Sequence, residues 1–219
     1  MKNNMFTKLS RVLSLVALTA FSNVLEAQFN WGPAGPVYTA GRARNMVVDR
    51  NSPSTLYVGS ASSGVFRSND AGANWVPIDD QGTVKNISYM AQAINNVIYV
   101  GTGEGFLRYG QKTRAQIGSG LYQLNGSQLS LVASSAITGT CINRIACSPV
   151  DASKIAIATN KGILISSDGG SSFTTANLAA YTVTNDVTYG MDVKFDNTGV
   201  LYCSIGNERG NAPFTNVSG

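Results

Sequence analysis

The sequence lacks histidine altogether, and only 13% of its 219 residues are charged. Without imidazole, the chain cannot form Ser-His-Asp or Cys-His nucleophilic sites, or histidine metal sites. Its formal net charge is +4, and it would be +2 without residues 1–27, which hold three basic groups and one acid. So small and scattered a charge argues against nucleic acid or anionic lipid as a partner. The groups left for catalysis are carboxylates, tyrosines, arginines and lysines, and we predict neither a metal nor a cofactor.

Long hydrophobic runs are also missing. The apolar run at residues 12–21 follows Lys2, Lys8 and Arg11 and leads to a small-residue end at Ala27. It is too short for a membrane anchor, which needs ~20 apolar residues. The order basic, apolar, small is typical of a secretory signal peptide. We predict a signal peptide over residues 1–27, export to the medium, cell envelope or cell surface, and no membrane span after cleavage.

Cysteine is scarce, with Cys141, Cys147 and Cys203 an odd number for an exported chain. In one extended segment, Cys141 and Cys147 would lie ~20 Å apart, too far for a disulfide. Unpaired cysteine often behaves as a small core residue. We therefore interpret the three as buried thiols.

One strand pattern recurs along the chain. The segment "STLYVGSASSGVF" (54–66) is similar to "NVIYVGTGEG" (96–105), "KIAIATNKGILI" (154–165) and "GVLYCSIGNERG" (199–210). Each copy follows another short run, at residues 44–49, 88–94, 143–149 and 190–196, with turn-forming residues between the two. Each pair of runs predicts a β-hairpin.

A third run opens at Gly64, Gly120 and Gly162, and a fourth run follows it. The unit is then a meander of four short strands, which cannot bury both of its faces alone. The unit repeats every 42 to 56 residues, measured from Gly64 to Gly120 to Gly162. This period and the four strands per unit are typical of a β-propeller blade. We predict an all-β fold, a β-propeller of four-stranded antiparallel blades at approximately residues 41–80, 84–134, 140–178 and 187–219.

The fourth copy stops at Gly219 before its third strand, so residues 28–219 hold about three and a half blades. Propellers close with about 4 to 8 blades. We therefore expect the sequence to be the N-terminal part of a longer protein, with closure by oligomerisation as the alternative.

A second pattern occurs twice, as "RSNDAGANW" (67–75) and "ISSDGGSSF" (165–173). An aspartate in such a turn accepts backbone N–H groups, the glycine supplies a positive φ angle, and the aromatic residue packs the turn against the sheet. A calcium loop would need several spaced oxygen ligands, which neither copy has. We interpret both turns as structural. Their residues are Ser68, Asp70, Gly72 and Trp75 in one copy, and Ser166, Asp168, Gly170 and Phe173 in the other.

This pattern resembles the Asp-box, or BNR repeat, of sialidase-type and sortilin-type β-propellers. Residues 41–78, "IYVGTGEG" at 98–105 and "WGP" at 31–33 are similar to exported propellers related to sortilin and to xyloglucan-cleaving glycoside hydrolases. The resemblance covers nearly the whole chain after residue 27. It implies a propeller with Asp-boxes at the rim and ligands near the central axis. The group includes enzymes, receptors and assembly factors, so it implies no single activity.

Two enzymatic activities can be checked against this resemblance. A sialidase would need an arginine cluster and an early Arg-Ile-Pro-like segment, but Arg42 and Arg44 lie in "GRARN" without Ile-Pro. We interpret them as hydrogen-bonding strand residues. A xyloglucan hydrolase would need two facing carboxylates. The resemblance places the first after the second strand of the first blade, where residues 60–63 are "SASS". Both activities are therefore disfavoured.

Two glutamates recur on glycine-rich connections after a second strand, Glu104 in "GTGEG" and Glu208 in "GNERG". Together with Arg108 and Tyr109, they could form a binding loop for a cation, a sugar or a basic peptide. The alternative is that each caps backbone amides within its loop.

The sequence supports two main hypotheses. The first is a non-catalytic exported interaction or scaffold module, with a protein or glycan partner at the propeller face. The second is the N-terminal part of a carbohydrate-active hydrolase whose catalytic carboxylates lie mostly in blades outside this sequence. A cell-surface adhesin is a third hypothesis.

Overall fold

The computed structural model describes residues 42–79, 82, 84–103, 118–132, 136, 137, 139–177 and 188–207. Every regular element in these segments is a β-strand. The described residues contain no helix that is long and apolar enough to cross a membrane. The predicted signal peptide at residues 1–27 and the "WGP" segment lie outside the described residues.

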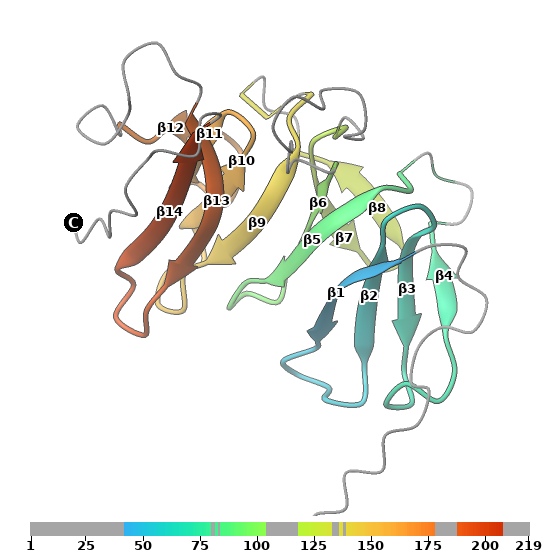
Figure 1. The fold of residues 1–219 in the computed structure, drawn as a ribbon. Helices are drawn as coiled ribbons and strands as arrows, with labels where there is room; N and C mark the ends of the chain where they lie inside the picture. The colour runs from blue at the N-terminus through green and yellow to red at the C-terminus, as the bar shows by residue number, and fades with distance from the viewer. Residues whose placement is uncertain are drawn as a thin grey trace, which may run out of the picture. The chain divides into compact units, whose positions relative to one another are not determined.

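The strands form antiparallel sheets that follow one another along the chain (Figure 1). The first sheet contains β1 (Ala43–Val48), β2 (Leu56–Ser60), β3 (Gly64–Ser68) and β4 (Val76–Ile78). The second contains β5 (Ile87–Gln92), β6 (Ile98–Thr102), β7 (Leu121–Asn125) and β8 (Gln128–Leu131). The third contains β9 (Ile142–Cys147), β10 (Ile155–Thr159), β11 (Gly162–Ser166) and β12 (Thr174–Thr175). The last pairs β13 (Thr188–Phe195) with β14 (Leu201–Asn207).

Each four-stranded sheet has its strands in sequence order, so every connection joins neighbouring strands. A meander of this kind is the blade of a propeller. The predicted fold class is confirmed: the chain is all-β, an incomplete β-propeller of four-stranded antiparallel blades.

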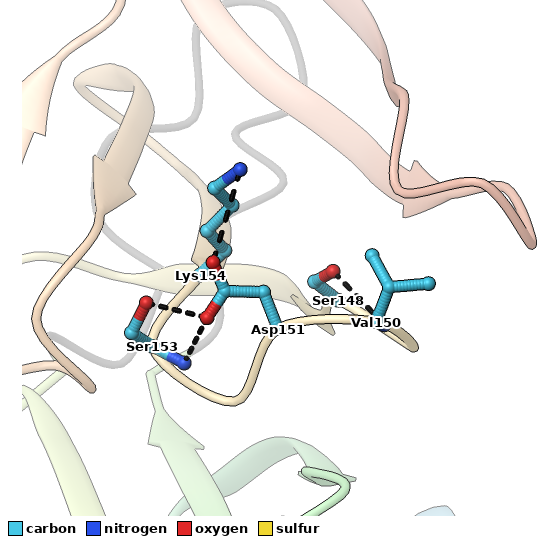
Figure 2. A network of polar contacts seen from close by, with 5 residues as sticks. All are labelled: Ser148, Val150, Asp151, Ser153 and Lys154. Atoms are coloured by element: carbon cyan, nitrogen blue, oxygen red, sulfur yellow. Dashed lines mark hydrogen bonds and ion pairs between the residues drawn. The ribbon is translucent and has the colours of Figure 1, made fainter.

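In the first, third and last sheets, an aspartate holds the hairpin turn between the first and second strands. In the β9–β10 turn, Oδ1 of Asp151 accepts hydrogen bonds from the backbone N of Ser153 at 2.9 Å and from its Oγ at 2.6 Å (Figure 2). Lys154 Nζ lies 3.8 Å from Oδ2 of the same carboxylate (Figure 2). Asp49 and Asp196 accept backbone N–H groups in the corresponding turns of the first and last sheets. These side chains satisfy amides that the strands leave unpaired.

Every first strand carries a β-bulge at the same point. The register shifts between Ala43 and Asn45 in β1, between Ile87 and Tyr89 in β5, and between Gly190 and Asp192 in β13. In β9 the pairing jumps from Ile142 to Arg144, which leaves Asn143 as the extra residue. The bulges are therefore at Arg44, Ser88, Asn143 and Met191. A bulge bends a strand and changes the direction of the side chains that follow it.

Successive sheets approach closely where a second strand meets the next first strand. A Cβ atom on Gly59 of β2 would lie 2.5 Å from Cγ2 of Ile87 in β5, and one on Gly101 of β6 would lie 2.7 Å from Cγ2 of Ile142 in β9. At the third interface the small residue changes sides, because a Cβ on Gly190 of β13 would lie 2.9 Å from Cα of Ala158 in β10. One of the two residues in each contact must therefore be small.

Buried apolar side chains gather in three clusters, one between each pair of successive sheets. The largest fully buried side chains include Tyr99, Ile87, Met90, Leu121 and Ile142. Hydrogen bonds also cross the interfaces. Asn45 Oδ1 accepts from Met90 N at 2.8 Å, and Asn143 Nδ2 donates to the Gly190 carbonyl at 2.7 Å.

The cysteines lie within this packing. None of the three forms a disulfide; Cys141 is buried, and Cys147 and Cys203 are partly buried. Burial raises the pKa of the Cys147 thiol to about 12 and also raises the pKa of Cys203. The prediction of buried thiols is therefore confirmed for Cys141 and only in part for Cys147 and Cys203, and the protonated Cys147 sulfur is a poor nucleophile.

We expect Gly101→Ala to lower the free energy of unfolding by about 1–3 kcal/mol, because the new methyl group overlaps Ile142. Urea unfolding would measure the change. The control is a double-mutant cycle with Ile142→Ala, which removes the overlapping Cγ2 atom. The cost of Gly101→Ala should then be smaller. Equal cost in both backgrounds would contradict the packing argument.

Candidate functional site

The first acidic turn, which joins β3 to β4, is closed by its own side chains. Ser68 Oγ donates to Asp70 Oδ1 at 2.7 Å and accepts from Gly72 N at 2.8 Å. Asp70 Oδ1 also accepts from Asn74 N at 2.8 Å, and its Oδ2 accepts from Asn74 Nδ2 at 2.7 Å. Trp75 Nε1 donates to the Gly72 carbonyl at 2.9 Å. The carboxylate is thus occupied by the turn itself.

The second acidic turn, which joins β11 to β12, repeats this arrangement. Ser166 Oγ donates to Asp168 Oδ1 at 2.8 Å and accepts from Gly170 N at 2.8 Å. Ser172 donates to the same carboxylate through its backbone N at 2.9 Å and its Oγ at 2.5 Å. Phe173 is buried in the cluster between the second and third sheets. The two turns therefore share one hydrogen-bonding scheme.

The φ angles of the glycines and the pKa values of the carboxylates in these turns agree with a structural role. Gly72 and Gly170 have φ angles of 95° and 90°, which side chains disfavour. Hydrogen bonds from Asn74 and Ser68 lower the pKa of Asp70 from 3.8 to about 2, and bonds from Ser172 and Ser166 lower that of Asp168 equally. Among the described residues, no three or more His, Cys, Asp or Glu side chains come together as they would to hold a metal ion.

The second turn is also tied to the neighbouring sheet. Tyr99 of β6 donates its hydroxyl hydrogen bond to the Gly169 carbonyl at 2.8 Å. A Cβ on Gly170 would lie 3.3 Å from the Tyr99 ring, so the turn and the ring are in close contact. Burial raises the pKa of Tyr99. This turn therefore links two sheets.

The predicted binding loop cannot be placed. Glu104, Arg108, Tyr109 and Glu208 all lie outside the described residues. They stay a prediction.

A cavity of about 490 Å³ lies instead against the first strands of three sheets. Its lining consists of Tyr89, Ala91 and Gln92 from β5, residues 144–147 of β9 and residues 192–195 of β13. This volume is typical of a small-molecule binding site. The first strands of successive sheets contact one another, which brings residues far apart in the sequence to one place.

Three polar side chains form a line across this cavity. Tyr89, Arg144 and Asp192 each follow the bulge in their strand, so they occupy equivalent positions in three blades. The Arg144 guanidinium carbon lies 4.7 Å from the centre of the Tyr89 ring, a cation–π contact. Its Nε lies 3.4 Å from Asp192 Oδ1. The side chains are 42% and 60% exposed, so this ion pair is open to solvent.

Charge and polarity are mixed in the lining. Arg144 and Lys194 are cationic, and Asp192 is the one carboxylate among the described lining residues. Gln92 is already engaged, since its Oε1 accepts from Arg50 N at 2.9 Å. Among the described residues, the lining therefore carries an excess of positive charge beside apolar surface from β5, β9 and β13.

Sequence reasoning did not identify this site. It recognised the runs at 88–94, 143–149 and 190–196 as repeated strands, but aligning these runs residue by residue matches Tyr89 with Arg144 and Met191, one position before Asp192. The alignment depends on the bulges, which leave no clear pattern in the sequence because they insert one residue into an otherwise regular alternation.

No protein-family model matches the chain, and no curated protein matches it in sequence. Solved structures match its fold. An ancestral GH74 enzyme has a TM-score of 0.58 and 15% identity over 80% of this chain and 25% of its own. The GH74 xyloglucanase from Xanthomonas campestris has a TM-score of 0.55 and 16% identity, over 73% of this chain and 27% of its own. The extracellular domain of a proposed one-component system from B. thetaiotaomicron has a TM-score of 0.53 and 12% identity, over 80% and 22%.

The chain thus spans about a quarter of the length of these proteins. At such low identity the likeness concerns the fold alone, because one fold serves many functions. It supports a β-propeller.

The acidic turns generate a prediction about pH. Their folded pKa values, about 2, lie below the ordinary 3.8, so the ionised carboxylates stabilise the folded state above about pH 4. That stability should be lost as the pH falls from about 4 to about 2. Thermal unfolding across this range should show a weaker pH dependence for the double variant Asp70→Asn, Asp168→Asn than for the wild type. An unchanged dependence would contradict the role of these turns.

Proposed function

We propose that the chain is part of an exported, non-catalytic β-propeller module that binds an extracellular saccharide in the cavity on its first strands. The observation that carries the proposal is the line Tyr89–Arg144–Asp192 across a cavity of about 490 Å³. Guanidinium and carboxylate groups hydrogen-bond sugar hydroxyls, and the apolar parts of the lining suit the faces of sugar rings.

Binding without cleavage is favoured by the carboxylates. Glycoside hydrolysis generally uses two facing carboxyl groups, one as acid and one as base or nucleophile. The described lining contains only Asp192, which is paired with Arg144. Asp70 and Asp168 are occupied within their turns. The described lining therefore offers no second carboxylate to face Asp192.

In this proposal the two acidic turns have a structural role, because they stabilise the connections between the third and fourth strands of their sheets. We interpret them as Asp-boxes, with Ser68, Asp70, Gly72 and Trp75 in one and Ser166, Asp168, Gly170 and Phe173 in the other. The export part of the proposal is supported by the signal-like residues 1–27. It is also supported by the fold likeness to an extracellular domain.

A second candidate is a carbohydrate-active hydrolase of which this chain is one part. It is favoured by the fold likeness to GH74 enzymes. In that case Glu104 or Glu208, together with carboxylates outside this sequence, would supply the acid and base.

The test is native gel electrophoresis of the chain in gels containing xyloglucan or polygalacturonate, together with an assay for released reducing ends. We expect at least one polysaccharide to retard the protein with no release. Arg144→Gln should weaken retardation roughly tenfold or more, because a charged hydrogen-bond donor is lost.

The matched control is Lys154→Gln, which removes one positive charge from the β9–β10 turn, outside the cavity. Its retardation should equal that of the wild type. Release of reducing ends that disappears in Glu104→Gln, Glu208→Gln or Asp192→Asn would establish the hydrolase instead. No retardation by either polysaccharide would overturn the binding proposal.

A further inference from the structure

We infer that the cavity takes an acidic saccharide, with Arg144 receiving the carboxylate of a hexuronate. The inference rests on the proposed function and specifies its ligand class. It starts from the charges of the lining, where Arg144 and Lys194 outnumber the one described carboxylate, Asp192. A neutral sugar would leave this excess of positive charge unmatched.

Arg144 is held in position, but its guanidinium group can still accept a closer anionic partner. The guanidinium carbon lies 4.7 Å from the centre of the Tyr89 ring, and this cation–π contact helps to hold Arg144 in position. The pair with Asp192 joins Nε to Oδ1 at 3.4 Å, longer than the roughly 2.7–2.9 Å of a strong charged hydrogen bond. Such an exposed pair contributes little stability. A ligand carboxylate can therefore replace Asp192 as the closer partner of Arg144.

The strand edge at this site disfavours a peptide that binds by adding a strand. A peptide that adds a strand needs a regular, unpaired strand edge. The bulge at Asn143 interrupts the regular pairing of β9 just where Arg144 crosses the cavity. A cavity of about 490 Å³ instead suits a compact ligand of a few sugar rings.

Asp192 has a distinct role in this arrangement. It occupies Arg144 in the absence of ligand and repels an incoming carboxylate. Removing its charge should therefore strengthen binding of an acidic ligand, whereas a purely structural Asp192 would give weaker or unchanged binding. This opposite sign makes Asp192→Asn the most informative variant.

The experiment is isothermal titration calorimetry of the whole chain at low ionic strength. The probe is trigalacturonate, and the matched neutral ligand is its methyl ester, which has the same sugar skeleton without the charges. We expect the acid to bind at least tenfold more tightly than the ester. Raising the salt concentration should weaken binding of the acid, because exposed charges are screened.

The variants are measured with the same probe. Arg144→Gln should weaken binding of trigalacturonate at least tenfold, and Arg144→Lys should lie between it and the wild type, since lysine keeps the charge but loses the planar fork. Asp192→Asn should tighten binding roughly fivefold, as expected for removal of one like charge near the ligand. Lys154→Gln should bind as the wild type does.

Three results would overturn the inference. These are equal affinity for the acid and its ester, weaker binding by Asp192→Asn, or tighter binding of an acidic peptide such as tetraglutamate than of trigalacturonate. If Arg144→Gln unfolds, the sign of the Asp192→Asn effect still decides. Binding of xyloglucan without trigalacturonate would reject only the inference. Binding of no saccharide would reject the proposed function as well.

Discussion

The close approach of neighbouring sheets is the constraint on which the rest of the structure depends. At each interface a small residue on one strand admits a neighbour from the next sheet: Gly59 admits Ile87, Gly101 admits Ile142, and Gly190 admits Ala158. A single methyl group at these points would push the sheets apart. Because the buried clusters lie between sheets, each blade depends on the next one for its core.

The same spacing creates the candidate site. When sheets pack this closely, their first strands also contact one another, and equivalent positions on those strands come within reach. The repeated bulge then directs Tyr89, Arg144 and Asp192 toward one another. The repeated strands place three residues at equivalent positions in three blades. Because these residues are an aromatic ring, a cation and a carboxylate, they differ in chemistry and can contact one another.

Five of the described aspartates fall into two groups with different physical roles. Asp70, Asp168, Asp151 and Asp196 have lowered pKa values because hydrogen bonds within tight turns favour their ionised forms. Their negative charge accepts hydrogen bonds within their own turns and so stabilises local structure. Asp192 instead lies half-exposed in the cavity beside Arg144, where a ligand can compete with it. The turns therefore stabilise the blades while the first strands remain available for binding.

The sequence alone determined the class of fold. Alternating runs, turn residues and the opening glycines of the third strands predicted hairpins and four-stranded sheets, because strand formation and turns depend on nearby residues. The acidic turns were equally local: the serine and the aspartate of each turn are two residues apart and bond directly. The cavity was different. Only the tertiary structure brought Tyr89, Arg144 and Asp192 together. Their contact depends on how closely the sheets pack and on where each strand bulges, and neither property can be predicted from nearby residues in the sequence.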